Sequence, residues 1–574
     1  MFRLKQTISR AKEFLPHKPF PKKKIILNTL AAFIILAILW VVSSLGQLRT
    51  FIPDYFKLVG TIFGNRTYLI LFENNNELRP TGGFISAYGV LEITHGFPTG
   101  LSFYDVYGEI DDHEYIDPPY YPMQELLWSE TYGGYTFRDA NYFINFPDSA
   151  TELIKFYQIT NPEAQIDGIV SVDFSTLEDL VGLYEPVAAG EFSLTQNNLF
   201  ETLEAEVSDI DRHSEEALSG RKDVMKDLIK NLIEKIIASP LSIRKLSDTI
   251  IENLNEKHII MWFEDEFMEN KVATLGWANT MPAMGISSDL LAVNEANLGG
   301  MKDDRYISRN IKYEVDIQET EILCTLTIDI DHFGGDNIPL SGNYKGYFRA
   351  FVPAGATLVS GTDETHTEAY DDYQAFGDIV RLDTGGNETL TYTYSLPIDM
   401  VKDGSYTLNL VKQPGTEADH YEIIVHTPQG STLNSDSFET KEEHAYLSLD
   451  LLQDKTLSLK INPDETAPRI HSHEIVEMNK IYIGFNEPLD CETASDPFAY
   501  SIQDTDKTMS GQTDVVYIDT ITCDGGNVWL DTLGMTSQDE EFYEITLRNI
   551  RDKHGNYIEP NPRVITVVQR GLGE

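Results

Sequence analysis

The chain is poor in cysteine. It holds three cysteines in 574 residues, Cys324, Cys491 and Cys523, and so small a number excludes a scaffold held together by many disulfides. A bridge between Cys491 and Cys523 inside one late domain fits the spacing. Buried free thiols fit it equally well, because connectivity does not follow from sequence alone.

Basic residues are also scarce, at 44 against 91 acidic ones, for a net charge of -47. Such a chain is repelled by nucleic-acid phosphates, so we expect no nucleic-acid partner. The G-x-S-x-G, Walker and H-E-x-x-H motifs are absent, which argues against the hydrolase and nucleotide chemistry that they serve. With 41% hydrophobic residues the chain should fold, and its length predicts three or four domains.

The few basic residues gather at the N-terminus, where residues 1–24 contain eight of them and one acid. Residues 25–45 follow without any charge, and about 20 apolar residues suffice to cross a bilayer. A cleaved signal peptide is the alternative, but its apolar core is usually about 7–15 residues. We therefore expect a cytoplasmic tail (1–24), one transmembrane helix (25–45) and an ectodomain from about residue 50.

Strand and helix patterns alternate between residues 60 and 312, which predicts an α/β fold built in layers. Residues 197–258 are helical in character and form an insertion in this domain. Strands are expected at 68–72, 84–94, 101–107 and 166–174, and helices at 146–158 and 175–184, the second with a serine cap.

Short alternating segments separated by Gly, Asn, Asp and Pro follow from residue 313. This pattern is typical of antiparallel sandwiches. We expect one β-sandwich at 313–430 and a second, Ig-like module at 466–568, joined by a linker around residues 462–470.

A polar loop, "ENNNELRPTGGF" (residues 73–84), joins the first two expected strands. Arg79 could grip a phosphate with paired hydrogen bonds, as could Arg138 farther along. Gly82 and Gly83 would let backbone N–H groups approach an anion, and Asn75 adds a donor. The alternative is structural: Arg79 pairs with Asp105 or Asp139 of its own chain, and the glycines form a turn.

Two carboxylates, Asp105 and Asp139, could hold Mg²⁺, which prefers oxygen ligands and keeps several waters. Asn141 follows Asp139 in "FRDAN" and is a further candidate for substrate binding. A second polar cluster, "NLGGMKDDR" (297–305), offers Lys302 and Arg305. It either closes over the same site or simply joins the helices to the sandwich.

Five segments resemble a bacterial family of unknown function, family 4012, in matching order over about residues 60–430. They are "LILFENNNELRPTGGFISAYGVL", "FRDANYFINFPDSA", "IDGIVSVD", "NEANLGGMKDDRYISR" and "LVKQPGT". The layout is also distantly similar to the LytR-CpsA-Psr enzymes, which are membrane-anchored and transfer glycopolymers from polyprenyl pyrophosphate carriers. Here "IDGIVSVDF" resembles a strand of that family, whereas its "IPRDT" motif has only partial counterparts, at Asp105 or at Arg138–Asp139.

This second resemblance implies an envelope protein that binds or transfers a phosphorylated lipid-linked glycan or a cell-wall polymer. In an enzymatic form, Asp105 or Asp139 would position Mg²⁺ and a nucleophile, while Arg79 and Arg138 would stabilise charge on the leaving pyrophosphate. "FNEPLD" (485–490) and "RDKHGN" (551–556) are similar to Ig-like domains of bacterial surface-layer proteins. The alternative function is therefore a non-catalytic surface scaffold or adhesin.

Overall fold

The structure is a computed structural model. The expected membrane helix at residues 25–45 lies outside the residues that it describes. Within the described residues, no helix is both long enough and apolar enough to cross a membrane. The described residues are 64–107, 110–111, 120–126, 134–208, 215–239, 243–282, 288–299, 302–335, 338, 341–428, 430–441, 443–505, 515–535 and 541–569.

The chain forms two compact units. The first comprises residues 1–402, 406–425 and 446–458, and the second comprises 403–405, 426–445 and 459–574. Helices and many strands are both present, in agreement with the expected α/β class with sheet-rich parts.

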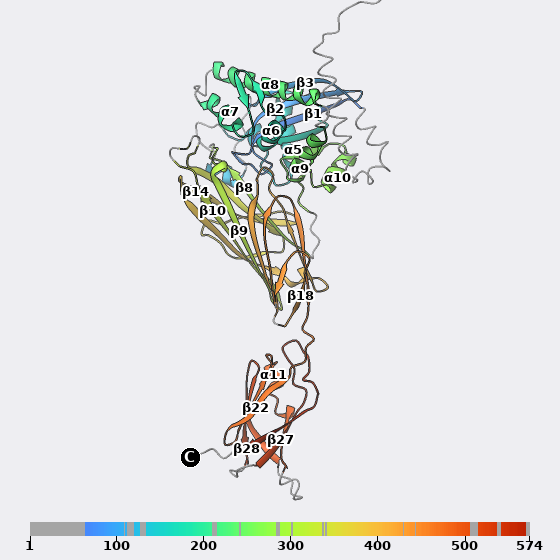
Figure 1. Ribbon diagram of the computed structural model, residues 1–574, viewed down its shortest axis with the longest axis vertical. Coiled ribbons are helices and arrows are strands. Elements are labelled where there is room, and N and C mark those ends of the chain that lie inside the picture. The colour runs from blue at the N-terminus through green and yellow to red at the C-terminus, as the bar shows by residue number, and fades with distance from the viewer. Residues whose placement is uncertain are drawn as a thin grey trace, which may run out of the picture. The chain divides into compact units, whose positions relative to one another are not determined.

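A five-stranded mixed sheet in the order β3-β2-β1-β4-β7 forms the N-terminal layer of the first unit (Figure 1). Only β1 and β4 run parallel, and their register places Glu73 opposite Asp173 at the carboxyl ends of the two strands. Both carboxylates are buried. The strands are β1 (Arg66–Asn74), β2 (Phe84–Thr94), β3 (Phe97–Asp105), β4 (Gly168–Asp173) and β7 (Ile259–Phe263).

The two helices that the spacing of apolar residues predicts, at 146–158 and 175–184, are present as α5 and α6 with small changes at their ends. In α5 Pro147 lies in the first turn, where a missing N–H costs nothing. The expected serine cap of the next helix, α6, is wrong: Asp173 accepts from Thr176 N–H at 3.1 Å. The helices are α4 (Tyr121–Leu126), η3 (Phe137–Asp139), α5 (Phe146–Thr160), α6 (Phe174–Tyr184), α7 (Leu199–Ser208), α8 (Glu215–Ala238), α9 (Ile243–Asn255) and α10 (Glu266–Thr274).

Two other expectations differ from the structure. The third strand begins at Phe97 rather than at residue 101, because His95 and Gly96 form the whole turn with positive φ angles of 54° and 78°. The expected sandwich at 313–430 begins earlier, since β8 (Asp289–Asn297) already lies in one of its sheets. β5 (Val187–Ala189) and β6 (Phe192–Leu194) form a separate two-stranded hairpin, which belongs neither to the five-stranded sheet nor to the sandwich.

Two sheets form the sandwich that continues the first unit. Each is part of a seven-stranded sheet, and six of its strands follow the order β12-β15-β10-β9-β17-β20 in one and β13-β14-β11-β8-β16-β21 in the other. The remaining bounds are η5 (Asp303–Tyr306), β9 (Ile307–Ile317), β10 (Glu321–His332), β11 (Tyr344–Pro353), β12 (Thr357–Ser360), β13 (His366–Ala369), β14 (Tyr373–Leu382), β15 (Asn387–Pro397), η6 (Ile398–Met400), β16 (Ser405–Leu410), β17 (Asp419–His426), β20 (His444–Leu451) and β21 (Lys455–Asn462).

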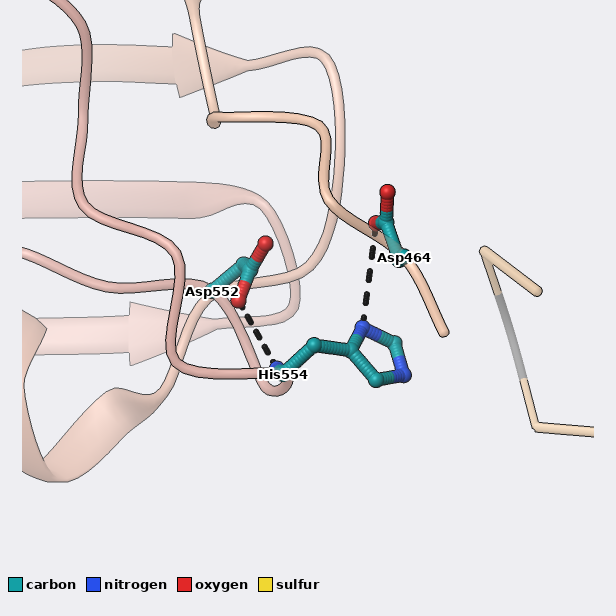
Figure 2. Close-up of side chains that lie close together, drawn as sticks. All are labelled: Asp464, Asp552 and His554. Atoms are coloured by element: carbon teal, nitrogen blue, oxygen red, sulfur yellow. Dashed lines mark hydrogen bonds and ion pairs between the residues drawn. The ribbon is translucent and has the colours of Figure 1, made fainter. Parts of the chain in front are cut away.

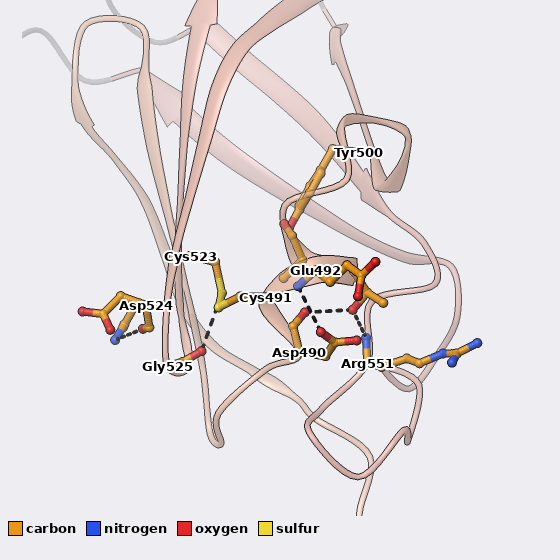
Figure 3. The surroundings of a disulfide bond; sticks show 11 residues. Asp490, Cys491, Glu492, Tyr500, Cys523, Asp524, Gly525 and Arg551 are labelled. Atoms are coloured by element: carbon orange, nitrogen blue, oxygen red, sulfur yellow. Dashed lines mark hydrogen bonds between the residues drawn. A yellow bond between two sulfur atoms is a disulfide. The ribbon is translucent and has the colours of Figure 1, made fainter.

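The second unit contains a seven-stranded sheet in the order β22-β23-β26-β25-β24-β27-β28. A disulfide joins Cys491, at the start of α11, to Cys523 near the end of β25, with Cα atoms 5.5 Å apart (Figure 3). Cys324 is a buried free thiol. Bounds in this unit are β18 (Thr432–Asn434), β19 (Glu439–Lys441), β22 (Ile470–Glu477), β23 (Lys480–Phe485), α11 (Cys491–Ala494), η7 (Pro497–Ala499), β24 (Tyr500–Asp504), β25 (Val515–Asp524), β26 (Asn527–Leu533), β27 (Glu541–Leu547) and β28 (Arg563–Gln569).

Candidate functional site

The polar loop between β1 and β2 does present a backbone N–H group to an anion, but the anion is the carboxylate of Glu73 in the same chain. Glu73 accepts from Gly83 N–H at 2.7 Å and from Thr81 Oγ at 3.3 Å. Burial raises the pKa of Glu73 to about 8, against the lowering effect of hydrogen bonds from Ser171, Gly83 and Asn141. The expected phosphate donor Gly83 is therefore occupied, and a Cβ at Gly82 would lie only 2.8 Å from Glu73 Oε2.

Arg79 is enclosed in the same loop. Its side chain is 3% exposed, lies 3.8 Å from Glu77 Oε1 and stacks over Phe84 at 5.6 Å. Its nearest ion pair is thus with Glu77, and not with Asp105 or Asp139 as the structural alternative expected. Among the described residues, Arg79 Nε has no hydrogen-bond partner. Asn141 donates to Gly83 O at 2.8 Å, so it holds the loop closed.

Arg138 and Asp139 lie together in η3. Arg138 is 3.2 Å from Asp111 Oδ2 and 3.9 Å from Asp139 Oδ2, and its guanidinium stacks over Tyr107. Burial raises the pKa of Asp139, while the charges of Arg79 and Arg138 lower it. Asp105 accepts from Tyr107 N–H at 2.9 Å, whereas Asp139 accepts from Thr136 Oγ1 at 3.3 Å.

The second polar cluster lies on a different hollow. Arg305 is exposed, stacks on Phe200 at 4.3 Å and lies 3.8 Å from Glu178 Oε1. Lys302 directly precedes η5 and is half-buried. Together with Asn75, Arg305 lines a hollow of about 330 Å³ beside the loop that follows β16.

A second hollow adjoins it, and we name it the carboxylate cleft. It has a volume of about 510 Å³ and shares Ser175, Glu178 and Glu417 with its neighbour. Its lining comes from α6, from the residues after β6, from α9 and the residues just after it, and from the loop after β16. The lining residues are Ser175, Glu178, Asp179, Gly182, Leu183, Gln196, Thr249, Glu252, Glu256, His258 and Glu417.

Hydrogen bonds fix the polar groups along one wall of the carboxylate cleft. Asn75 Nδ2 donates to Ser175 Oγ at 2.8 Å, and Ser175 Oγ donates to Glu417 Oε1 at 2.7 Å. Asn75 thus contacts a residue that lines the cleft, as Arg305 does through Glu178. Asn253 donates to Asp179 Oδ2 at 2.9 Å and orients that carboxylate as well.

A buried imidazole, His258, also lines the cleft, and its Nδ1 lies 2.6 Å from Asp173 Oδ2. Burial lowers the pKa of His258, but the charge and hydrogen bond of Asp173 outweigh it and raise the pKa above its usual value. The pKa of Glu178 is raised to about 7: burial is the main cause, the charge of Arg305 opposes it, and the charges of Glu417 and Asp179 add to it.

Sequence reasoning missed Glu178, His258 and Glu417. Asp173 ends β4 and Ser175 lies in the first turn of α6. The ends of strands are where α/β sheets tend to bind ligands. The position of these residues at a strand end therefore indicated the edge of the sheet beside which the cleft lies. Glu417 lies 242 residues beyond Ser175, in a segment whose sequence shows no such feature.

One cluster in the second unit has the composition of a metal site. Asp464, Asp552 and His554 each place a ligand atom within 4.8 Å of the others. Figure 2 shows Asp464 and His554 facing one another, with Asp464 Oδ2 and His554 Nδ1 3.7 Å apart. Asp552 accepts from the backbone N–H groups of His554 and Asn556, so this carboxylate also closes its own turn.

Residues 64–207 match the model of a protein family described as "Protein of unknown function (DUF4012)". The family resemblance is confirmed for this segment. It includes the polar loop, η3 and α6 of the carboxylate cleft, whereas His258 and Glu417 lie outside the matched range. No curated protein matches the chain.

Solved structures that resemble the chain include the N-terminal part of a bacterial S-layer protein, SbsC (16% identity, TM-score 0.16, 18% of this chain and 24% of that one). An S-layer protein is thus among the neighbours, as the C-terminal resemblance led us to expect, and the chain spans about a quarter of it. Others are an M1 zinc metallopeptidase from Deinococcus radiodurans (12%, TM-score 0.18, 32% and 47%) and a protein from Listeria innocua (10%, TM-score 0.18, 38% and 78%). TM-scores this low carry no functional conclusion.

Proposed function

We propose that the chain is a single-pass membrane-anchored protein of the cell envelope that binds a cell-wall polymer without altering it chemically. Residues 1–24 would remain cytoplasmic, residues 25–45 would span the membrane, and the rest would face outward. Two Ig-like β modules would follow the binding domain and serve as spacers. The carboxylate cleft would hold a short stretch of the polymer.

The cleft is the observation that supports binding. Its volume of about 510 Å³ lies within the range of about 300–1,000 Å³ typical of ligand pockets. Its wall offers hydroxyl, amide and carboxylate groups held by hydrogen bonds, such as Ser175 and Asp179. Groups of this kind suit a polymer rich in hydroxyl and amine groups.

Burial of Arg79 favours binding over transfer. A transferase of the kind that the distant resemblance implies needs its arginine at a pyrophosphate, with Mg²⁺ between the two. Here Arg79 is 3% exposed beside Glu77, and Arg138 lies against Asp111. Transfer of a glycan from a polyprenyl carrier therefore ranks second.

Pelleting with purified bacterial peptidoglycan tests the proposal. The full chain in nonionic detergent should sediment with the wall material. Thr249→Trp, which fills the cleft without changing its charge, should abolish sedimentation. Thr151→Trp is the matched control on the exposed face of α5 and should sediment like wild type. If Thr249→Trp sediments normally, the cleft does not bind the wall.

A second assay separates binding from transfer. The same protein is incubated with polyprenyl pyrophosphate and Mg²⁺, and Arg79→Ala and Arg138→Ala are compared with wild type. We expect no lipid binding that depends on either arginine. Lipid binding by wild type that is lost in both variants would instead support glycan transfer from a polyprenyl carrier.

A further inference from the structure

We propose that the carboxylate cleft recognises its ligand through primary ammonium groups. This inference rests on the proposed function for the cleft's role, and it adds the chemistry of the ligand. The shared chemistry is an organic molecule with two or more separated amines, and either a free aliphatic polyamine or a polymer of amino sugars could supply it.

Charge is the first argument. Five carboxylates line the cleft: Glu178, Asp179, Glu252, Glu256 and Glu417. Among its described lining residues there is no lysine or arginine, and His258 is the one side chain that can become cationic. Arg305 approaches Glu178 from the neighbouring hollow, and the charge of buried Lys412 acts on Glu256 and Glu417 without lining the cleft. A cation is therefore the complement that the walls lack.

His258 supplies an independent second argument. Its side chain is 5% exposed, and Asp173 holds Nδ1. Within the part of the chain that the structure describes, Nε2 has no partner, although the ring lines the cleft. With Nδ1 donating to Asp173, neutral Nε2 is an acceptor for an ammonium N–H.

The spacing of the carboxylates argues against a single metal ion. Among the described residues, three ligand atoms of Asp, Glu, His or Cys come within 4.8 Å of one another only at Asp464, Asp552 and His554. The carboxylates of the cleft do not converge in this way. Several positive groups spaced along one organic ligand fit such walls, whereas one Ca²⁺ or Mg²⁺ needs its oxygen ligands at about 2.0–2.6 Å.

Isothermal titration calorimetry on the full chain in nonionic detergent tests this proposal. The probes are spermidine, a glucosamine tetrasaccharide with free amines, its N-acetylated counterpart, and CaCl₂, at pH 7.5 and low salt. The variant is Glu178→Gln/Glu417→Gln. Its matched control is Glu163→Gln/Glu319→Gln, which removes the same charge from exposed positions.

We expect spermidine, the glucosamine tetrasaccharide or both to bind, and the cleft variant to weaken binding at least about tenfold, because hydrogen bonds to charged groups are the strong ones. The control variant should change affinity less than about twofold. Binding of spermidine alone identifies a free polyamine as the source, and binding of the tetrasaccharide alone identifies an amino-sugar polymer.

Three results would overturn the proposal: neither amine binds, the N-acetylated tetrasaccharide binds as tightly as the free amine, or the cleft variant binds the amines normally. Calcium binding that the cleft variant abolishes, without amine binding, would identify a metal site instead. Wall sedimentation without amine binding would refute this inference alone. Amine binding without wall sedimentation would refute only the proposed function.

Discussion

The backbone N–H of Leu78 donates to Asp304 Oδ2 at 2.8 Å, across 226 residues of chain. Two backbone hydrogen bonds run in the opposite direction: Asp304 N–H donates to Asn76 O at 3.2 Å, and Asn297 N–H donates to Leu78 O at 2.9 Å. The two polar clusters of the sequence therefore meet, through Asp304 and backbone groups. The contact joins the α/β sheet to the sandwich inside the first unit.

Arg309 stabilises this junction electrostatically. Its Nη2 donates to Glu295 at 2.9 Å and to Asp304 at 2.8 Å, and its side chain is 8% exposed. Arg309→Met leaves two buried carboxylates facing one another, so we expect a loss of about 3–5 kcal/mol at pH 7. The loss should be smaller at pH 5, where one carboxylate can take up a proton. Calorimetric unfolding measures both.

Arg381→Met is the control for that experiment, because Arg381 is exposed on β14. A surface substitution of this kind changes stability by less than about 0.5 kcal/mol. Equal effects of the two substitutions would show that the Arg309 network contributes nothing specific.

The sequence predicts the features that depend on neighbouring residues, but not those that depend on contacts between residues far apart in the chain. The residues 84–94 of β2 and the start of α5 follow from alternation and from Pro147, both local signals. Asp173 replaces the expected serine cap because α6 begins at Phe174, one residue earlier than expected, and the same carboxylate also bonds His258, 85 residues away. The cleft depends on Ser175 meeting Glu417, and no local pattern encodes a contact over that distance.

The loop "ENNNELRPTGGF" needs glycine at residue 83 for close approach. A Cβ there would lie 2.4 Å from the carbonyl carbon of Asn74 and 2.5 Å from its oxygen. Gly83→Ala must displace backbone, so we expect a loss of about 1–3 kcal/mol in thermal unfolding. Gly355→Ala, whose nearest contact would be Pro397 Cγ at 3.4 Å, should be close to neutral. A neutral Gly83→Ala would refute the close packing of this loop.

Asp289, in the core of the sandwich, should make the free energy of unfolding depend on pH. It is fully buried and accepts from Tyr313 Oη at 2.6 Å. Burial raises the pKa of Asp289 to about 6 despite the hydrogen bonds of Tyr313 and Tyr406. Because its folded pKa exceeds its unfolded value, its contribution to stability is largest below about pH 4 and is lost as pH rises to about 6.

The lost contribution should be about 2–3 kcal/mol. Asp289→Asn keeps an acceptor but cannot titrate, so the variant should gain stability relative to wild type as pH rises from 4 to 6. Urea unfolding at these two pH values measures the difference. A constant difference would mean that Asp289 does not titrate in this range.

The disulfide between Cys491 and Cys523 closes a loop with a sequence separation of 32. In the chain-entropy model, a loop of this length stabilises the folded state by about 3–4 kcal/mol. Cys491→Ala/Cys523→Ala should therefore lower the Tm of the second unit, and dithiothreitol should lower the Tm of wild type to a similar value. The reductant should leave the double variant unchanged, and any further decrease there would implicate another bond.

Glu178 should make amine binding depend on pH. Its pKa of about 7 reflects burial first, then the charges of Glu417, Asp179 and Asp173, opposed by Arg305. A protonated Glu178 attracts an ammonium group poorly, so spermidine affinity should rise about tenfold from pH 6 to pH 8 as the carboxyl ionises. His258, which faces Asp173, Lys412 and Glu417, adds to the same trend because its protonated form repels the ligand.

Glu178→Gln separates the two contributions. The variant should bind more weakly at pH 8 and lose most of the pH dependence, keeping only the part due to His258. Titrations in two buffers with different ionisation enthalpies should detect about half a proton released per ligand from Glu178 at pH 7, and less in the variant. An affinity that is flat from pH 6 to pH 8 in wild type would place the ammonium groups away from Glu178.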